Sequence, residues 1–195
     1  MAAINPTKIA GRWREGFTLD LHTLDSTFIG YNEFGHPMFE NEYSEVGALL
    51  YRLKNKHDDS VVEELADTVA RFVRSWNQEI QLVVPVPPTR QRAKQPVFLV
   101  GAALSEKLGV PFKNCVAAVK KISELKNVSE YSERVKLLKD AHTVEQSVVE
   151  GRKVLLFDDL FRSGATLSAV TDVLYDRGRA AEVYAVTLTR TRVKS

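Results

Sequence analysis

The spacing of hydrophobic side chains changes once along the chain, and this change divides the sequence into two parts. Hydrophobic and polar residues alternate over residues 17–24, which predicts a half-buried strand. The turn sequence Gly35-His36-Pro37 follows, so a small strand-rich appendage is expected over residues 1–43. Residues 44–195 begin instead with the helical spacing of an amphipathic helix, formed by Val46, Leu49, Leu50 and Leu53.

The rest of residues 44–195 alternates between helix-like and strand-like segments. Ser60 and Glu63 have the spacing of a capping box, which predicts a second helix that begins at Ser60. Short hydrophobic strands and longer helical segments then follow one another: strands at 80–86, 115–119, 153–157 and 183–188, and helices at 97–108, 129–139 and 167–177. Such alternation is typical of a parallel sheet that is covered on both faces. The predicted fold class is therefore α/β, with a mostly parallel twisted sheet, helices on both faces and the N-terminal appendage.

Composition excludes several classes of protein. The 195 residues include 27 Lys and Arg against 25 Asp and Glu, a formal net charge of +2, so nucleic acid is not expected to be the main ligand. The single cysteine, Cys115, excludes an intrachain disulfide and a cysteine-rich zinc site, and we interpret it as a small buried hydrophobic residue. No segment has the pattern of a targeting signal or a membrane span, so we expect a soluble cytoplasmic protein with no membrane partner.

The segment Val154-Leu-Leu-Phe-Asp-Asp-Leu-Phe-Arg-Ser-Gly-Ala-Thr166 carries the candidate chemistry. A buried strand is followed by two carboxylates, Asp158 and Asp159, and then by a short loop that leads into a helix. Ligands of open α/β sheets bind just beyond the carboxyl ends of strands, and the free N–H groups at a helix N-terminus suit an anion. Two carboxylates would repel a bare phosphate group. A sugar phosphate that arrives with Mg²⁺ fits better, because it offers hydroxyl groups and a cation as well.

These thirteen residues resemble the phosphoribosyl-pyrophosphate (PRPP) motif of type I phosphoribosyltransferases. Both have four apolar residues, two acidic residues, a variable stretch and Gly-x-Thr. The resemblance implies that Asp158 and Asp159 are catalytic residues that bind the ribose hydroxyls. It also implies that the 5′-phosphate is held by the loop of Phe161, Arg162, Ser163, Gly164, Ala165 and Thr166.

Three more segments resemble the ComF-like (competence-type) branch of that family, at residues 44–54, 84–92 and 95–111, and the likeness extends over residues 44–190. It implies a phosphoribosyltransferase-like domain over residues 44–195, with Mg²⁺ that is carried by PRPP and has no direct protein ligand. Arg90 is then the candidate for the pyrophosphate group, and Lys120, Lys121 and Lys126 lie in the segment that corresponds to a flexible loop. The chain departs from this branch in two places. It lacks the N-terminal zinc-binding cysteine pairs, and Arg92-Ala-Lys94 stands where the branch has Arg-Gly-Phe-Asn.

Other interpretations of the acidic pair were weighed. A Walker B strand end is disfavoured because no Gly-x4-Gly-Lys-Ser/Thr segment precedes it, and a receiver-type phosphoacceptor pair normally follows the first strand. Polar residues that merely end a strand are the remaining alternative. The four histidines, His22, His36, His57 and His142, are scattered without the spacing of metal ligands.

The expected function is transfer of a phosphoribosyl group from PRPP to a nitrogenous base with release of pyrophosphate. The alternative is a non-catalytic protein that binds PRPP or a nucleotide and regulates a partner or assists DNA uptake. A third hypothesis gives the N-terminal appendage a partner-binding role. The acceptor, which is a base or a nucleotide, stays open at this stage, and so does a homodimer.

Overall fold

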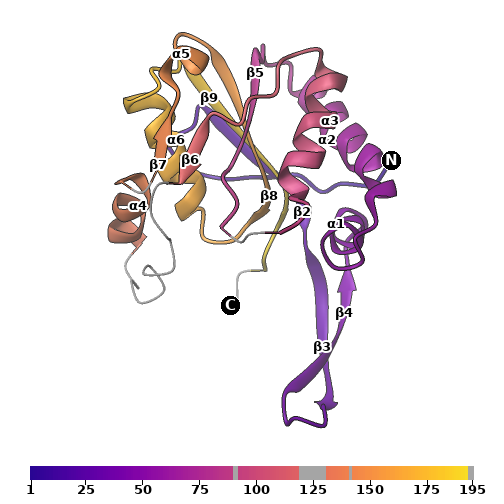
Figure 1. The fold of residues 1–195 in the computed structure, drawn as a ribbon. Coiled ribbons are helices and arrows are strands. Elements are labelled where there is room, and N and C mark those ends of the chain that lie inside the picture. Colours follow the sequence, from indigo (N-terminus) through magenta and orange to yellow (C-terminus); the bar gives the residue numbers. More distant parts are fainter. Residues whose placement is uncertain (90–91, 119–130, 141, 193–195) are drawn as a thin grey trace.

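The computed structural model describes residues 1–89, 92–118, 131–140 and 142–192. Its elements, shown in Figure 1, are β1 (Thr7–Lys8), β2 (Glu15–Leu21), β3 (Thr23–Tyr31), β4 (Pro37–Tyr43), α1 (Glu45–Asn55), η1 (Asp59–Val61), α2 (Val62–Trp76), β5 (Leu82–Pro85), α3 (Pro96–Leu108), β6 (Val116–Ala118), α4 (Tyr131–Asp140), β7 (His142–Val144), α5 (Gln146–Val149), β8 (Lys153–Phe161), α6 (Ala165–Asp176) and β9 (Glu182–Arg190).

The central sheet has five strands in the order β1-β2-β9-β8-β5. Strands β2, β9, β8 and β5 are parallel, and β1 is antiparallel at one edge. Two small antiparallel sheets, β3-β4 and β6-β7, lie outside it. The predicted α/β class with a mostly parallel sheet is therefore confirmed, although the expected strand at 115–119 pairs with β7 rather than joining the main sheet.

Alternate side chains of β8 face two separate hydrophobic layers. Leu155 and Phe157 belong to the core cluster that includes residues of α1, α2 and α3, whereas Val154 and Leu156 belong to the cluster that includes residues of α6. Figure 1 shows these helices on opposite sides of the sheet. Because both faces of β8 are covered, its sequence is hydrophobic without interruption from Val154 to Phe157.

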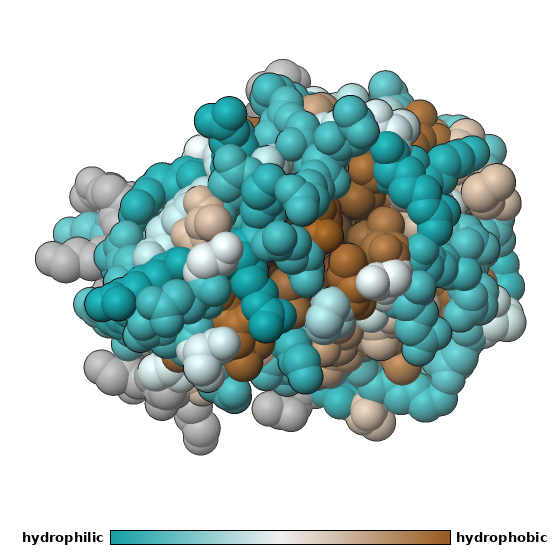
Figure 2. All heavy atoms as spheres, turned by 90° about the horizontal axis from the view of Figure 1, so that it is seen from above, coloured by the Kyte–Doolittle hydropathy of each residue, from teal (hydrophilic) through white to brown (hydrophobic). Residues whose placement is uncertain are grey.

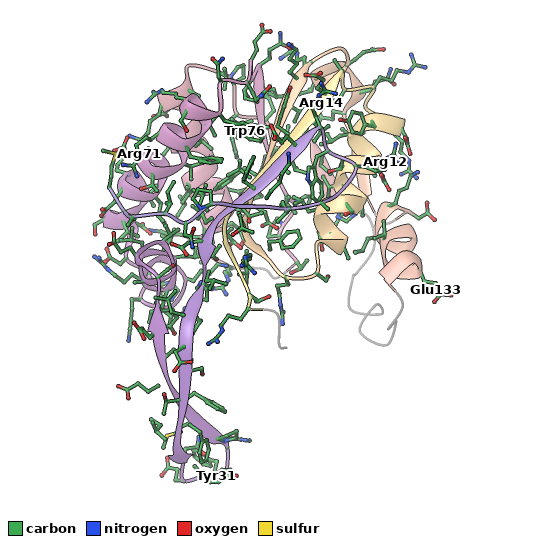
Figure 3. The ribbon with its side chains drawn as sticks, turned by 180° about the vertical axis from the view of Figure 1, so that it is seen from behind. Arg12, Arg14, Tyr31, Arg71, Trp76 and Glu133 are labelled. Atoms are coloured by element: carbon green, nitrogen blue, oxygen red, sulfur yellow. The ribbon has the colours of Figure 1, made fainter. Side chains whose placement is uncertain are left out.

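The strand predicted from the alternation at residues 17–24 forms as β2, inside the main sheet, but it ends at Leu21. It pairs with β9 in parallel, with Phe17 opposite Val186, and Leu19 is fully buried. The ring of Phe17 meets that of Trp76 edge-on at 5.2 Å between ring centroids, so α2 packs against this strand (Figure 3). The division expected after residue 43 therefore does not coincide with the packing. The chain leaves the main sheet after Leu21. The alternating pattern of a strand does not specify which sheet the strand joins, so the sequence could not place this boundary.

Strands β3 and β4 form a hairpin that projects from the body of the molecule (Figure 1). The predicted Gly-His-Pro turn is confirmed: Gly35 has a φ of 74°, a conformation that glycine adopts without strain. The Asn32 carboxamide oxygen accepts from the amides of Phe34 and His36 and closes the turn.

The prediction that the second helix begins at Ser60 is wrong. The Asp58 carboxylate accepts from the Ser60 amide and caps the short η1 turn, and α2 begins only at Val62. An aspartate two residues upstream of the serine thus takes the capping role. The expected helix at 97–108 is confirmed as α3, which ends at Gly109 in a left-handed conformation.

The surface at the end of the molecule away from the hairpin is mostly hydrophilic, with hydrophobic side chains visible in the hollow at its centre (Figure 2). Within the described ranges, no helix is both long and apolar enough to cross a lipid bilayer.

Candidate functional site

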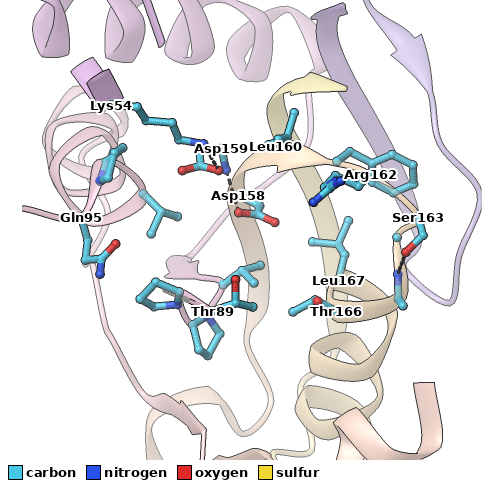
Figure 4. Close-up of a pocket in the computed structure, with 18 of the residues that line it drawn as sticks. Lys54, Thr89, Gln95, Asp158, Asp159, Leu160, Arg162, Ser163, Thr166 and Leu167 are labelled. Carbon is cyan, nitrogen blue, oxygen red and sulfur yellow. Dashed lines mark hydrogen bonds and ion pairs between the residues drawn. The ribbon is translucent and has the colours of Figure 1, made fainter. Parts of the chain in front are cut away.

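A cavity of about 340 Å³ opens at the carboxyl end of β8. Its wall combines four parts of the chain: the last turn of α1, the loop between β5 and α3, the end of β8 and the start of α6 (Figure 4). The lining residues are Lys54, Val86, Pro87, Pro88, Thr89, Arg92, Gln95, Pro96, Val97 and residues 158–167. The cavity thus brings together Asp158, Asp159 and all six loop residues that the motif singled out.

The turn from β8 into α6 depends on Gly164. This residue has a φ of 75°, and a Cβ atom added to it would lie 2.8 Å from the ring of Phe161. The first hydrogen bond of α6 runs from the Ser168 amide to the Gly164 carbonyl, at 2.8 Å. The N–H groups just before it, at the start of the helix, have no acceptor within the helix, so they suit an anion.

The two carboxylates differ in their surroundings. Asp159 pairs with Lys54 across the cavity, with 2.8 Å between Oδ1 and Nζ, and both side chains are less than one-fifth exposed. Asp158 accepts a hydrogen bond of 2.8 Å from the Asp159 amide. Burial, together with the neighbouring charge of Asp159, raises the pKa of the Asp158 carboxyl to about 8. The pair is therefore protonated more readily than two separate carboxyl groups, and Asp159 is the member that faces Lys54.

A second layer of polar groups supports Asp159 from the side of the hairpin. The Thr189 hydroxyl donates to the Asp159 carbonyl at 3.2 Å, and it lies 3.4 Å from His22 Nδ1. Burial and the nearby positive charge of Lys54 lower the pKa of His22, so this ring is neutral near pH 7. The base of the hairpin is in this way connected to the cavity.

The opposite wall is the loop between β5 and α3, which the resemblance assigns to pyrophosphate. Arg92 lines the cavity, but its guanidinium donates to the Lys54 carbonyl at 2.9 Å and so ties the loop to α1. Lys94 forms an ion pair with Asp59. Arg90, the predicted pyrophosphate residue, lies outside the described residues, as do Lys120, Lys121 and Lys126 of the predicted flexible loop.

Four polar residues of the cavity are not among the predicted site residues: Lys54, Thr89, Arg92 and Gln95. Each lies in a segment that resembles the ComF-like branch, and this resemblance is the sequence feature from which they could have been predicted as site residues. Their place in the cavity depends on contacts between distant parts of the chain, and these cannot be read from the sequence. Among the residues that the structure covers, no group of three or more His, Cys, Asp and Glu side chains is arranged to hold a metal ion.

The topology and the cavity define an α/β protein in which paired carboxylates lie beside a helix N-terminus, in a cavity at the carboxyl edge of the sheet. No protein-family model matches the chain. In sequence the chain is 26% identical over 142 residues to competence protein ComFC of Bacillus subtilis (strain 168), and the match covers 72% of this chain and 58% of that protein. The chain thus spans somewhat more than half of its relative, and the match confirms the resemblance to the ComF-like branch.

Two solved structures are similar to the chain at low sequence identity. One is the adenine phosphoribosyltransferase of Leishmania tarentolae, with a TM-score of 0.49 and 13% identity, covering 95% of this chain and 94% of that one. The other is the adenine phosphoribosyltransferase of Trypanosoma brucei in complex with AMP, pyrophosphate and ribose-5-phosphate. Its TM-score is 0.49 at 15% identity, with 98% of this chain and 96% of that one covered.

Proposed function

We propose that the cavity binds PRPP together with Mg²⁺, and that the protein transfers the phosphoribosyl group to a nitrogenous base with release of pyrophosphate. One observation carries this proposal. The carboxylates of Asp158 and Asp159 share a single cavity with the loop of residues 161–166 and the first turn of α6. A ligand that spans both parts must offer hydroxyl groups to the carboxylates and an anionic group to the loop, and PRPP does both.

Each part of PRPP has a matching group in the cavity. The hydroxyls of Ser163 and Thr166 and the amides at the start of α6 suit the 5′-phosphate. The Ala165 amide contacts the Ser163 hydroxyl at 3.5 Å, a long hydrogen bond that a phosphate oxygen could replace. The carboxylates of Asp158 and Asp159 suit the ribose hydroxyls, as acceptors. The pyrophosphate would extend toward the loop between β5 and α3, the segment that includes Arg90. When bound, Mg²⁺ would neutralise charge on the pyrophosphate oxygens, and PRPP itself would supply its main ligands.

In the proposed reaction, a lone pair on the acceptor nitrogen forms a bond to C1 of the ribose. The C1–O bond to pyrophosphate breaks, its electron pair leaves with pyrophosphate, and the acceptor nitrogen gives up its proton to solvent. Positive charge develops at C1 in the transition state. The negative charge of the acidic pair stabilises this positive charge, and Asp158 and Asp159 together hold the ribose in place, so the protein needs no strong base.

The second candidate function is binding without turnover. The relative with 26% identity is named a competence protein, and the described basic residues of the pyrophosphate-side loop, Arg92 and Lys94, are engaged with α1 and Asp59. In this case PRPP or a nucleotide would occupy the same cavity and regulate a partner. The two functions differ in one measurable product, because only the transferase releases pyrophosphate when PRPP and an acceptor base are supplied together.

Calorimetric titration with PRPP tests the binding step. We expect saturable binding that needs Mg²⁺, and about tenfold or greater weakening in Asp159→Asn, because a charge-assisted hydrogen bond contributes about 1.5–3 kcal/mol. Asp172→Asn is the matched control. Asp172 forms an ion pair of 2.6 Å with Arg12, is similarly buried and lies outside the cavity. No saturable binding to the wild-type protein, or equal weakening in both variants, would contradict the proposal.

A screen of purine and pyrimidine bases for pyrophosphate release then separates the two functions. Release with one base, lost in Asp158→Asn, supports transfer. Tight binding of PRPP with no release for any base supports the binding protein.

A further inference from the structure

The hairpin β3–β4 carries a concentration of exposed hydrophobic side chains. Among the described residues, the large hydrophobic side chains that are exposed are Met1 and seven residues of this hairpin, which are 39–75% exposed: Leu24, Phe28, Ile29, Tyr31, Phe34, Met38 and Phe39. Patches of this kind on soluble proteins mark interaction surfaces. The tip, with Tyr31 and Phe34, is the most exposed part and points away from the body (Figure 3).

The hairpin has little support of its own. It is a two-stranded sheet, and isolated hairpins of this kind are only marginally stable in water. Its internal packing is a small aromatic cluster in which Phe28 meets Tyr31 and Phe39 edge-on, at 5.2 and 5.7 Å between ring centroids. Burial of its outer surface against another molecule would stabilise it.

The base of the hairpin is held firmly, so the direction in which it projects is fixed. The Ser44 hydroxyl donates to the Leu21 carbonyl at 2.5 Å, and Arg192 contacts both the Leu24 carbonyl and the Asp25 carboxylate. The hairpin leaves the sheet at its carboxyl edge and extends beyond the body (Figure 1). Its tip therefore lies beyond the part of the body that the structure describes, where a second molecule could cover it.

The charge of the hairpin indicates the chemistry of that molecule. Residues 23–43 include four acidic side chains, Asp25, Glu33, Glu40 and Glu42, and no Lys or Arg. The remainder of the chain holds all 27 basic side chains against the other 21 acidic ones. Nucleic acid and anionic membranes would be repelled by the hairpin, and two hairpins would repel one another. The body of a second copy of the chain, in contrast, has the complementary charge.

We propose that the hairpin is an association arm: two copies of the chain form a dimer in which the arm of each packs on the basic body of the other. This reciprocal arrangement satisfies the two-fold symmetry of a closed dimer. The aromatic tip supplies the buried contacts and the acidic side chains orient the arm. The inference does not depend on the proposed function, because it uses only the exposure and charge of residues 23–43 and the charge of the rest of the chain.

Sedimentation velocity of the full chain at several concentrations tests this proposal. We expect a dimer for the wild-type protein, and a dissociation constant at least about tenfold higher in Tyr31→Ser/Phe34→Ser, since exposed aromatic residues dominate such contacts. Both side chains are solvent-exposed, and the variant loses the Phe28–Tyr31 contact but keeps the Phe28–Phe39 contact, so the hairpin is expected to fold in this variant. A fall in the thermal unfolding temperature of the variant would show that its hairpin does not fold.

A charge reversal gives a second, independent comparison. Glu33→Lys/Glu40→Lys should weaken the dimer, whereas the control Glu106→Lys/Glu133→Lys, which makes the same charge change at exposed positions of the body, should leave it intact or strengthen it. Amide hydrogen exchange should also slow in residues 25–42 as the protein concentration rises. A wild-type protein that is monomeric throughout, or a dimer that the tip and charge variants leave unchanged, would overturn the proposal.

Discussion

Lys54 Nζ lies 2.8 Å from Asp159 Oδ1, and this ion pair joins the last turn of α1 to the carboxyl end of β8. The side chains are 16% and 18% exposed, so the pair is shielded from water much more than the ion pairs on the surface of the body. Because Asp158 directly precedes Asp159 along the strand, Lys54 places a positive charge beside the acidic pair in the cavity. The same lysine receives the Arg92 hydrogen bond at its carbonyl, so it connects three walls of the site.

Replacement of this lysine should destabilise the protein. In Lys54→Met the charge of Asp159 loses its partner in a partly buried place, and we expect the free energy of unfolding to fall by about 1–3 kcal/mol. Thermal unfolding measures this change. Lys153→Met, which removes a more exposed pair with Glu79, should change stability much less, because water screens that pair. Equal losses in the two variants would show that the pair in the cavity has no special role.

The raised pKa of Asp158 predicts a dependence of stability on pH. A carboxyl whose pKa in the folded state is raised to about 8, from about 3.9 when unfolded, favours folding below pH 4 and progressively loses that contribution as the pH rises to 8. Asp158→Asn removes this loss. The unfolding temperature of the variant minus that of the wild-type protein should therefore be larger at pH 8.5 than at pH 5.5. The same difference between the two proteins at both pH values would contradict this origin of the pKa shift.

Gly164→Ala tests the close packing of the loop. A left-handed φ costs a non-glycine residue roughly 1–2 kcal/mol, and here the new Cβ would also lie 2.8 Å from the ring of Phe161. Gly151→Ala is a matched control, since Gly151 has a φ of 69° with nothing within 4 Å of its Cβ position. Chemical denaturation should show a larger loss for Gly164→Ala than for Gly151→Ala. If the two losses were equal, the ring of Phe161 would not restrict the loop.

The serine that caps α1 gives a prediction about the base of the hairpin. The Ser44 hydroxyl accepts from the Gly47 amide at 3.0 Å and donates to the Leu21 carbonyl, so Ser44→Ala should cost about 1–2 kcal/mol of stability. Ser60→Ala is the comparison, because Ser60 has the sequence pattern of a cap while Asp58 holds that position. In equilibrium unfolding, Ser60→Ala should lose less stability than Ser44→Ala. The reverse order would contradict the capping roles of Ser44 and Asp58.

The parts of the fold and site that the sequence predicts are local in the chain. The run from Val154 to Thr166 contains a strand, its acidic end and the start of a helix in one continuous segment, so the cavity wall could be predicted from it. The place of β2 could not, because its alternation shows one covered face and does not specify β9 as its neighbour. The start of α2 differs from the prediction for another reason. Both Asp58 and Ser60 have side chains that can cap a helix, and in the structure the amide and hydroxyl of Ser60 both donate to the Asp58 carboxylate.

Lys54 shows the same limit at the site. Its helix was predicted from hydrophobic spacing, and helical spacing places its side chain at the end of α1. The contact with Asp159, more than 100 residues away, depends on how α1 packs on the sheet. Such a pairing is a property of the tertiary structure and has no local signal.

The most direct test of the central claim is a nuclear magnetic resonance titration of the ¹⁵N-labelled chain with PRPP and Mg²⁺. The account predicts that the backbone amides of Ser163, Gly164, Ala165 and Thr166 shift first and most, and that Asp159→Asn requires a higher concentration of PRPP for the same shifts. Shifts confined to other parts of the chain, or none at saturating PRPP, would contradict it.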